Sequence, residues 1–311
     1  MLSPRSVLCP FSPGSSTSAA LQQALALAGR VQAPLHITPW PDTSVAREGA
    51  TGESATEEAV RSAVQSMVVD APPPPMLHTE SWKADSFSVE TWLAYTADND
   101  IDLVVLAPPE GHSAGPIMAC QALQPMIMRT TAALLTVGMG QQRTSFQRVL
   151  TPTDMTPESI ATLHHAEAVA AMYDARLDVL HGLAQRKYVA LTPTDLLALD
   201  DAAMAPRTAK RRLRTWYRRN AHPAYANRLG AQMHVQEGDP TTAILRAVHA
   251  RKSSLLVMAA TQRTPREAGL SPITEKVLRR TTCSVLVTRP HYRNLVAPAV
   301  GDSTQSYVPA S

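Results

Sequence analysis

Three segments of the first half of the chain reappear in the second half, in the same order and at similar spacing. The two copies of each segment are Val7–Pro10 and Val149–Pro152, Asp102–Ala107 and Ser254–Ala259, and Arg129–Leu135 and Arg280–Leu286. Each copy then spans roughly 145 residues, which is the usual size of one domain with its own core. An internal repeat of this kind predicts two small domains rather than one large one. We place domain 1 at residues 1–142, domain 2 at residues 143–293 and a flexible tail at residues 294–311.

Within each copy, short apolar strands alternate with amphipathic segments of helical period. Such alternation is typical of right-handed βαβ units, which build a parallel sheet covered by helices on both faces. The expected fold class is therefore α/β, with two tandem doubly wound parallel sheets of five strands each. In such a sheet the ligand crevice lies at the carboxyl ends of the strands. The end of the first strand and the loop after the fourth strand should thus form the site of each copy.

Composition and charge limit the class of protein further. The hydrophobic content of 44% is ordinary for a globular protein, and no apolar run approaches the roughly 18 residues that a membrane helix needs. The apolar stretch near the start is too short for a signal peptide, and three scattered cysteines give no disulfide framework. We expect a cytoplasmic protein without membrane insertion.

The two copies carry charge of opposite sign. Residues 1–143 contain 7 Lys and Arg against 13 Asp and Glu, whereas residues 144–311 contain 22 against 13. This asymmetry would favour face-to-face docking of the two domains as an internal pseudo-dimer. The alternative is that the charges only solvate separate surfaces.

Several short motifs resemble the universal stress protein family, and the second copy resembles it most. The opening strand with its turn, a Gly-x-Pro turn after the third strand, and the last two strands are all similar to the family's. These segments are Val149–Asp154, Gly238–Pro240, Leu256–Met258 and Arg280–Thr288, and the resemblance covers nearly all of residues 5–138 and 146–290. It implies the adenine-nucleotide α-hydrolase-like fold of universal stress proteins. It also implies a cytoplasmic protein, dimeric or tandem, that either binds ATP or does not.

The resemblance also says where a nucleotide would bind. In ATP-binding members an aspartate after the first strand recognises the nucleoside, and a glycine-rich loop after the fourth strand wraps the phosphates. Copy one has Ser12 at the aspartate position and Glu110 in the loop, so we expect no nucleotide there. Copy two keeps Asp154 but has lost most loop glycines. Its candidate cofactor-binding residues are Pro152, Thr153, Asp154, Gly238, Met258, Arg263, Gly269 and Ser271.

Three readings of the copy-two site remain open. It could bind ATP, or Arg263 and Arg266 could bind another anionic ligand by charge. Alternatively, Asp154 caps the turn into the following helix and no small ligand binds.

A strongly basic segment lies in the long insert at residues 182–232. Leu213, Trp216 and Tyr217 give it a narrow apolar stripe at helical spacing, so we expect a surface helix docked by one edge. Its cations could form a solvated face, bind an acidic protein partner (domain 1 included) or, as the least favoured reading, bind nucleic acid. They are Arg207, Lys210, Arg211, Arg212, Arg214, Arg218 and Arg219.

The remaining polar residues give no catalytic or metal-binding pattern. His164 and His165 are neighbours in a helix and do not share a face, so we read them as surface or boundary residues. We expect His36 and His181 to occupy matching places in the second strand of each copy, as hydrogen-bonded histidines at the end of a sheet. Cys9 is more plausible as a buried inert thiol than as a redox sensor. No Ser-His-Asp order, catalytic carboxylate pair or zinc spacing is evident.

These observations predict a non-enzymatic stress-response or regulatory protein with degenerate nucleotide sites and no cofactor. One alternative is an ATP-binding regulator, or slow ATPase, that uses domain 2. Another is a structural or interaction subunit of a larger assembly that docks through the basic helix at residues 207–219. A homodimer is also compatible with the sequence.

Overall fold

A computed structural model describes ten stretches of the chain. They are residues 2–11, 15–39, 53–67, 71–80, 88–107, 124–138, 144–183, 206–260, 270–289 and 295–296. Every structural statement below concerns these residues.

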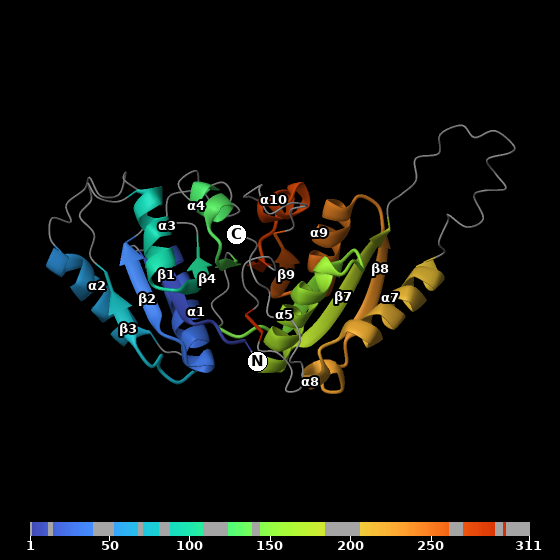
Figure 1. Cartoon of the computed structure of the whole chain (residues 1–311), viewed down its shortest axis with the longest axis horizontal. Coiled ribbons are helices and arrows are strands. Elements are labelled where there is room, and N and C mark those ends of the chain that lie inside the picture. Colours follow the sequence, from blue (N-terminus) through green and yellow to red (C-terminus); the bar gives the residue numbers. More distant parts are fainter. Residues whose placement is uncertain are drawn as a thin grey trace, which may run out of the picture.

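Strands and helices alternate in both halves, as the sequence predicts (Figure 1). The first half contains β1 (Ser6–Phe11), α1 (Ser15–Val31), β2 (Leu35–Pro39), α2 (Glu53–Ser66), β3 (Leu77–Thr79), α3 (Val89–Asp98), β4 (Ile101–Leu106), α4 (Gln124–Arg129) and β5 (Ala133–Thr136). The second half contains β6 (Arg148–Thr153), α5 (Glu158–Met172), β7 (Arg176–Leu183), α7 (Pro206–Asn220), α8 (Pro223–Ala226), β8 (Gln232–Glu237), α9 (Pro240–Arg251), β9 (Leu255–Ala259), α10 (Pro272–Leu278) and β10 (Ser284–Thr288).

The ten strands form one continuous sheet. Its order is β3-β2-β1-β4-β5-β10-β9-β6-β7-β8, so each half contributes five parallel strands in the same order. The expected fold class, two doubly wound five-stranded units, is confirmed. In each unit the first strand lies in the middle, and the chain winds outward from it in both directions.

The two units meet edge to edge and not face to face. β5 pairs with β10 in the antiparallel sense, with Leu135 opposite Leu286. Thr136 lies opposite Val285 on one side of this pair, and Leu134 lies opposite Val287 on the other. These pairings are related by an approximate two-fold axis through Leu135 and Leu286, which is how two copies of one surface meet in a symmetric dimer.

Helices cover both faces of the sheet, and each face has its own buried core that runs through both halves. One core contains residues of α1, α5 and α7, such as Leu21, Leu163 and Leu213. The other contains residues of α3, α4, α9 and α10, such as Trp92 and Val277. The inner strands β1 and β4 are buried on both sides, which explains their nearly continuous apolar sequence.

The two ends of the described chain lie together. Leu2 and Val296 form an antiparallel bridge, the amide of Ser3 donates to the carbonyl of Leu295, and Leu295 and Val296 are buried. The expectation of a flexible tail from residue 294 is therefore wrong at these two residues. Residues 297–311 lie outside the described part of the chain.

Strand register corrects the pairing of histidines across the two copies. His36 lies beside Leu8, whereas the residue beside the equivalent Leu150 is Asp178 and not His181. His181 lies beside Thr153, at the carboxyl end of the sheet. The prediction that His36 and His181 occupy matching places is wrong, because a shift of three residues along a strand moves a side chain to the opposite face.

None of the helices in the described stretches is both long and apolar enough to cross a membrane.

Candidate functional site

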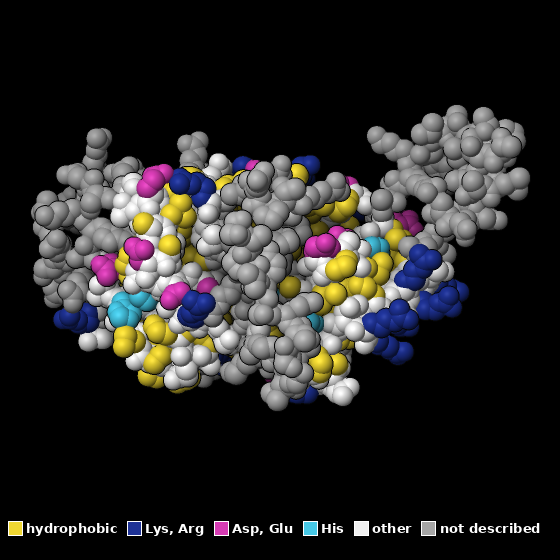
Figure 2. Space-filling model, viewed as in Figure 1, with side chains coloured by type: hydrophobic (Ala, Val, Ile, Leu, Met, Phe, Trp, Pro, Cys, Tyr) yellow, Lys and Arg dark blue, Asp and Glu magenta, His cyan; other side chains and the backbone are white. Residues whose placement is uncertain are grey.

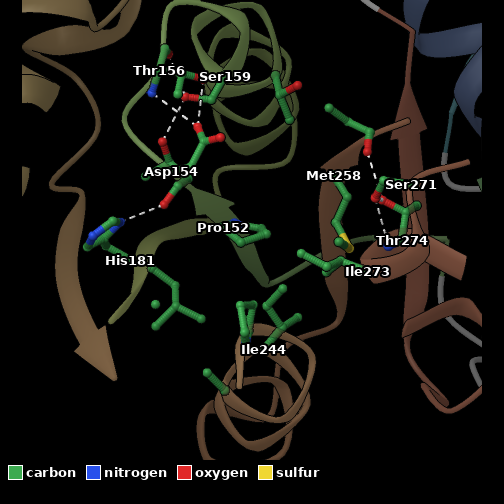
Figure 3. Close-up of a pocket in the computed structure, with 17 residues that line it drawn as sticks. Pro152, Asp154, Thr156, Ser159, His181, Ile244, Met258, Ser271, Ile273 and Thr274 are labelled. Carbon is green, nitrogen blue, oxygen red and sulfur yellow. Dashed lines mark hydrogen bonds between the residues drawn. The ribbon is translucent and has the colours of Figure 1, made fainter. Parts of the chain in front are cut away.

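A pocket of about 210 Å³ lies at the carboxyl ends of β6, β7 and β9 in the second half (Figure 3). This is the crevice position expected for a doubly wound sheet. Asp154, Thr156 and Ser159 line one side, where β6 turns into α5. Apolar side chains, among them Ile244 and Met258, line the opposite wall. The pocket thus has a polar rim and an apolar wall, and the described lining contains no Lys or Arg.

Asp154 is engaged within its own turn. Its Oδ1 accepts hydrogen bonds from the Thr156 amide, at 3.1 Å, and from the Thr156 hydroxyl, at 2.7 Å (Figure 3). This is an Asx turn, in which the carboxylate takes the place of a backbone acceptor. It shapes the entry into α5, and Pro157, which follows, provides no side-chain cap. Asp154 therefore performs the capping role that the sequence left as one alternative, and its carboxylate is exposed at the pocket rim.

Ser159, His181 and Asp154 line the same pocket, which the order of the residues along the chain did not suggest. The Ser159 hydroxyl lies 2.9 Å from the Thr156 carbonyl, to which it donates, and 2.8 Å from the Thr153 hydroxyl. His181 Nδ1 lies 2.8 Å from the carbonyl of Thr153 and therefore donates to it. No bond joins any two of the three side chains within the described residues, so they do not form a nucleophile–base–carboxylate relay.

The far side of the pocket is built from the start of α10. Ser271 caps this helix by accepting a bond from the Thr274 amide at 3.1 Å, and the Thr274 hydroxyl donates to the Ala259 carbonyl at 2.9 Å. Asp239 caps α9 in the same way, through the Thr242 amide. These caps orient the two helices whose first turns border the pocket.

The structure brings together five of the eight residues predicted for the site. Pro152, Thr153, Asp154, Met258 and Ser271 line the pocket. Gly238 does not line it; it follows β8 with a φ of 125°, and its amide extends the β7–β8 pairing by donating to the Leu183 carbonyl. Arg263 and Gly269 lie outside the described residues, as does Arg266.

Three further residues, His181, Ile244 and Ile273, line the pocket without having been predicted from the sequence. His181 could have been found from the position of β7 beside β6, because it stands at the carboxyl end of its strand. Ile244 and Ile273 are apolar residues of amphipathic helices, and such residues carry no sign in sequence that distinguishes a pocket wall from a core.

The equivalent region of the first half differs. The residue that corresponds to Thr153 is Phe11, which is buried, whereas Ser12 and Glu110 lie outside the described residues. Cys9 is fully buried, as predicted, and burial raises the pKa of its thiol well above the usual range.

The basic segment forms α7, an exposed helix docked by one edge. Ala209, Leu213 and Tyr217 are buried against β8 and the core, and Trp216 is half-buried. Of the seven cations, the six arginines are exposed and Lys210 is half-buried. None of them forms an ion pair with a described residue, so no described acidic side chain of domain 1 neutralises them.

α5 carries polar residues that α7, α8 and residue 295 cover. His165 is completely buried: its Nδ1 lies 2.6 Å from the Ala161 carbonyl, and its Nε2 accepts from the Leu295 amide. The prediction of a surface or boundary position is wrong for His165 and holds for the half-buried His164. Burial lowers the pKa of His165 to about 4, so this side chain is neutral at physiological pH.

Glu167 is the most deeply buried acidic residue of this cluster. One carboxylate oxygen accepts from the His222 amide at 2.9 Å, and the nearby Tyr217 hydroxyl also interacts with the carboxylate. Burial raises the pKa of Glu167 to about 7. The cluster joins α5 to the insert and lies away from the pocket. No group of three or more His, Cys, Asp or Glu side chains in the described stretches could hold a metal ion.

Comparison with known proteins agrees with this architecture. Residues 145–289 match the model of the universal stress protein family. The second half of the chain is a universal stress protein domain. The first half repeats its fold, so the chain has the tandem form of the universal stress proteins.

Solved structures that cover nearly the whole chain share this fold. A functionally unknown protein from Pseudomonas aeruginosa PAO1 is 18% identical, with a TM-score of 0.67 and 92% of each chain covered. A protein from Pseudomonas aeruginosa UCBPP-PA14 that is described as a universal stress protein is 17% identical, with the same TM-score. The match covers 92% of this chain and 93% of that one. A universal stress protein from Archaeoglobus fulgidus DSM 4304 is 12% identical, with a TM-score of 0.52 and coverage of 93% and 97%. No curated protein matches the chain in sequence.

Proposed function

We propose that this tandem universal stress protein is a non-enzymatic regulatory protein of the stress-response type whose nucleotide sites are degenerate. The observation that carries the proposal is the state of Asp154. In the family's ATP-binding members the aspartate at this position recognises the nucleoside, but here its Oδ1 is occupied by Thr156. A nucleoside would have to compete with these bonds or use the remaining oxygen alone.

The electrostatics of the pocket support the same proposal. A triphosphate needs cations or a cradle of backbone amides to offset its charge. The described lining offers neither Lys nor Arg, and Asp154 adds negative charge at the rim. The Ser159 hydroxyl is engaged by carbonyl and hydroxyl partners, and no base among the described residues is hydrogen-bonded to it. The described part of the lining therefore supplies no side-chain cation to offset the charge of a triphosphate.

The alternative is an ATP-binding regulator, or slow ATPase, that uses domain 2. It is favoured by the pocket itself, which lies at the expected crevice and keeps an exposed carboxylate beside an apolar wall large enough for a purine.

Nucleotide released from the purified protein by heat and identified by mass spectrometry separates the two candidates. The regulatory proposal predicts no stoichiometric nucleotide and no ATP hydrolysis above that of the buffer. Release of about one nucleotide per protein from the wild type, and of none from Asp154→Ala, would establish the alternative. Asp98→Ala, which removes an exposed carboxylate of domain 1, is the matched control.

A further inference from the structure

The exposed face of α7 concentrates positive charge that nothing in the described part of the chain neutralises. Its 15 residues include six Arg and one Lys and no acidic residue. Figure 2 shows these side chains gathered at the right end of the molecule, over α7. This end is the β8 edge of the sheet, whereas the acidic half of the chain lies toward the β3 edge. The charge is thus presented outward, on the edge away from the acidic half.

The cations form two rows along the helix. Arg207, Arg211, Arg214 and Arg218 are spaced i, i+4, i+7 and i+11, which places them on one side of the exposed face. Arg212 and Arg219 are spaced i, i+7 on the other side, and Thr215 lies between the rows. At a rise of about 1.5 Å per residue, the longer row extends for roughly 16 Å with a guanidinium every 5–6 Å. A regular line of positive charge of this kind suits a regular line of negative charge.

Arginine, rather than lysine, makes up nearly all of the face. The planar guanidinium binds phosphate oxygens with two parallel hydrogen bonds, which gives geometric fit in addition to charge.

The face lacks what a stable protein–protein interface needs. Interface cores are enriched in aromatic and apolar side chains and depleted of charge. On α7 the apolar residues are buried or half-buried, and the exposed large hydrophobic residues of the described chain lie elsewhere, at Met76, Leu77 and Ile273. The face would therefore offer an acidic protein positive charge but no apolar residues for the core of an interface. A nucleic-acid backbone needs no such centre, because its affinity comes from the release of counterions.

The absence of an exposed aromatic side chain on α7 also distinguishes duplex from single strand. Proteins that bind single strands stack the bases on aromatic rings. Tyr217 is buried and Trp216 is half-buried, so the exposed residues of the helix after Pro206 are six arginines and Thr215. B-form DNA has a major groove wide enough to accept one face of a helix, whereas the corresponding groove of an RNA duplex is narrow.

We propose that the outer face of α7 binds the phosphate backbone of double-stranded DNA without reading its sequence. The row formed by Arg207, Arg211, Arg214 and Arg218 contacts the phosphates of one strand, and Arg212 and Arg219 lie toward the other. The contact is electrostatic and is independent of the pocket of domain 2.

The test is the salt dependence of binding between the full-length protein and a labelled random duplex of about 30 base pairs, followed by fluorescence anisotropy. If four arginines each neutralise one phosphate, the affinity falls about a hundred-fold between about 50 and 200 mM salt. The triple variant Arg211→Gln, Arg214→Gln and Arg218→Gln removes three of these contacts. It should weaken binding at low salt at least about tenfold and flatten the salt dependence.

A matched triple variant distinguishes the effect of α7 on DNA binding from the effect of net charge. Arg176→Gln, Arg246→Gln and Arg280→Gln remove the same charge from exposed arginines outside α7 that form no described ion pair. This control should bind DNA like the wild type, and circular dichroism should show both triple variants folded. Equal loss of affinity in the two triple variants would overturn the proposal, because it would reflect overall charge alone.

Three further outcomes would also overturn it. One is the absence of binding at about 50 mM salt, and another is tighter binding of single-stranded DNA or duplex RNA than of duplex DNA. The third is equally effective competition by polyglutamate of matched charge, which would indicate an acidic protein as the partner.

Discussion

Single residues of the pocket show how one side chain can serve the fold at the position where a relative would bind a ligand. Asp154 completes a turn by accepting from the Thr156 amide and hydroxyl, and the Thr153 hydroxyl accepts from the Met155 amide at 2.9 Å. Met155 itself has a φ of 62°, in the left-handed region that a residue without special support rarely adopts. The polar groups around it hold this conformation in place.

Replacing Asp154 with alanine should therefore lower stability even when no ligand is present. Loss of a side-chain acceptor at a helix entry typically costs about 1 kcal/mol of unfolding free energy. Asp154→Asn keeps an oxygen in the same place and should retain most of that stability. Urea unfolding of the three proteins measures the effect, and an alanine variant as stable as the wild type would contradict the role in the turn.

At the scale of elements, the helix α5 is unusual because it is buried nearly all round. α7, α8 and residue 295 cover the side that would otherwise face solvent, and Glu167 and His165 are enclosed there. Burial acts on the two groups in opposite senses, since it disfavours the charged form of each. It raises the pKa of Glu167 to about 7 and lowers that of His165 to about 4.

Glu167 should make stability fall as the pH rises. Between its reference pKa of 4.5 and the folded value of about 7, the folded chain holds a proton that the unfolded chain has lost. The free energy of unfolding therefore decreases across this window, by roughly 3 kcal/mol in total, and is constant above it. The direction is opposite to that of a salt-bridged carboxylate.

The variant Glu167→Gln isolates this effect, because the glutamine oxygen can still accept from the His222 amide. Urea unfolding at about pH 5 and about pH 8 should show a smaller loss of stability for the variant than for the wild type. The buried His165 acts in the opposite direction, because it lowers the free energy of unfolding as the pH falls below 6.5. Its contribution is the same in both proteins. Parallel pH profiles would show that Glu167 is ionised in the folded chain at both pH values.

The helices and strands were largely predictable from the sequence, whereas the contacts and strand register between distant segments were not. The apolar strands and the stripe of Leu213 and Tyr217 follow from periodicity, and the structure confirms them. The burial of His165 depends on a segment 130 residues away, which no local pattern reveals. The register error at His36 and His181 has the same origin, because strand pairing is set by packing across the sheet. Within the site, Asp154 was predictable from its strand end, and the apolar wall was not.

At the scale of the whole molecule, we expect the two halves to unfold as one unit, because their sheets are continuous. Beyond the β5–β10 ladder, Arg289 crosses from the second half into the first. Its side chain is buried, with Nη2 donating to the Ile127 carbonyl at 2.5 Å and Nε donating to the Ala132 carbonyl at 3.2 Å. Arg289 thus neutralises the carboxyl end of α4, where unpaired carbonyls carry partial negative charge.

Removing this side chain should weaken both halves together. Arg289→Ala leaves the Ile127 and Ala132 carbonyls buried without these donors, at a cost of about 3 kcal/mol. For a chain of this size that corresponds to a fall in Tm of roughly 5 °C. Scanning calorimetry should show one transition in the wild type and one transition at lower temperature in the variant.

Arg279→Ala, which removes an exposed helix pair with Glu275, should leave Tm nearly unchanged. Two separate transitions in the wild type would mean that the halves unfold independently and that the continuous sheet does not couple them.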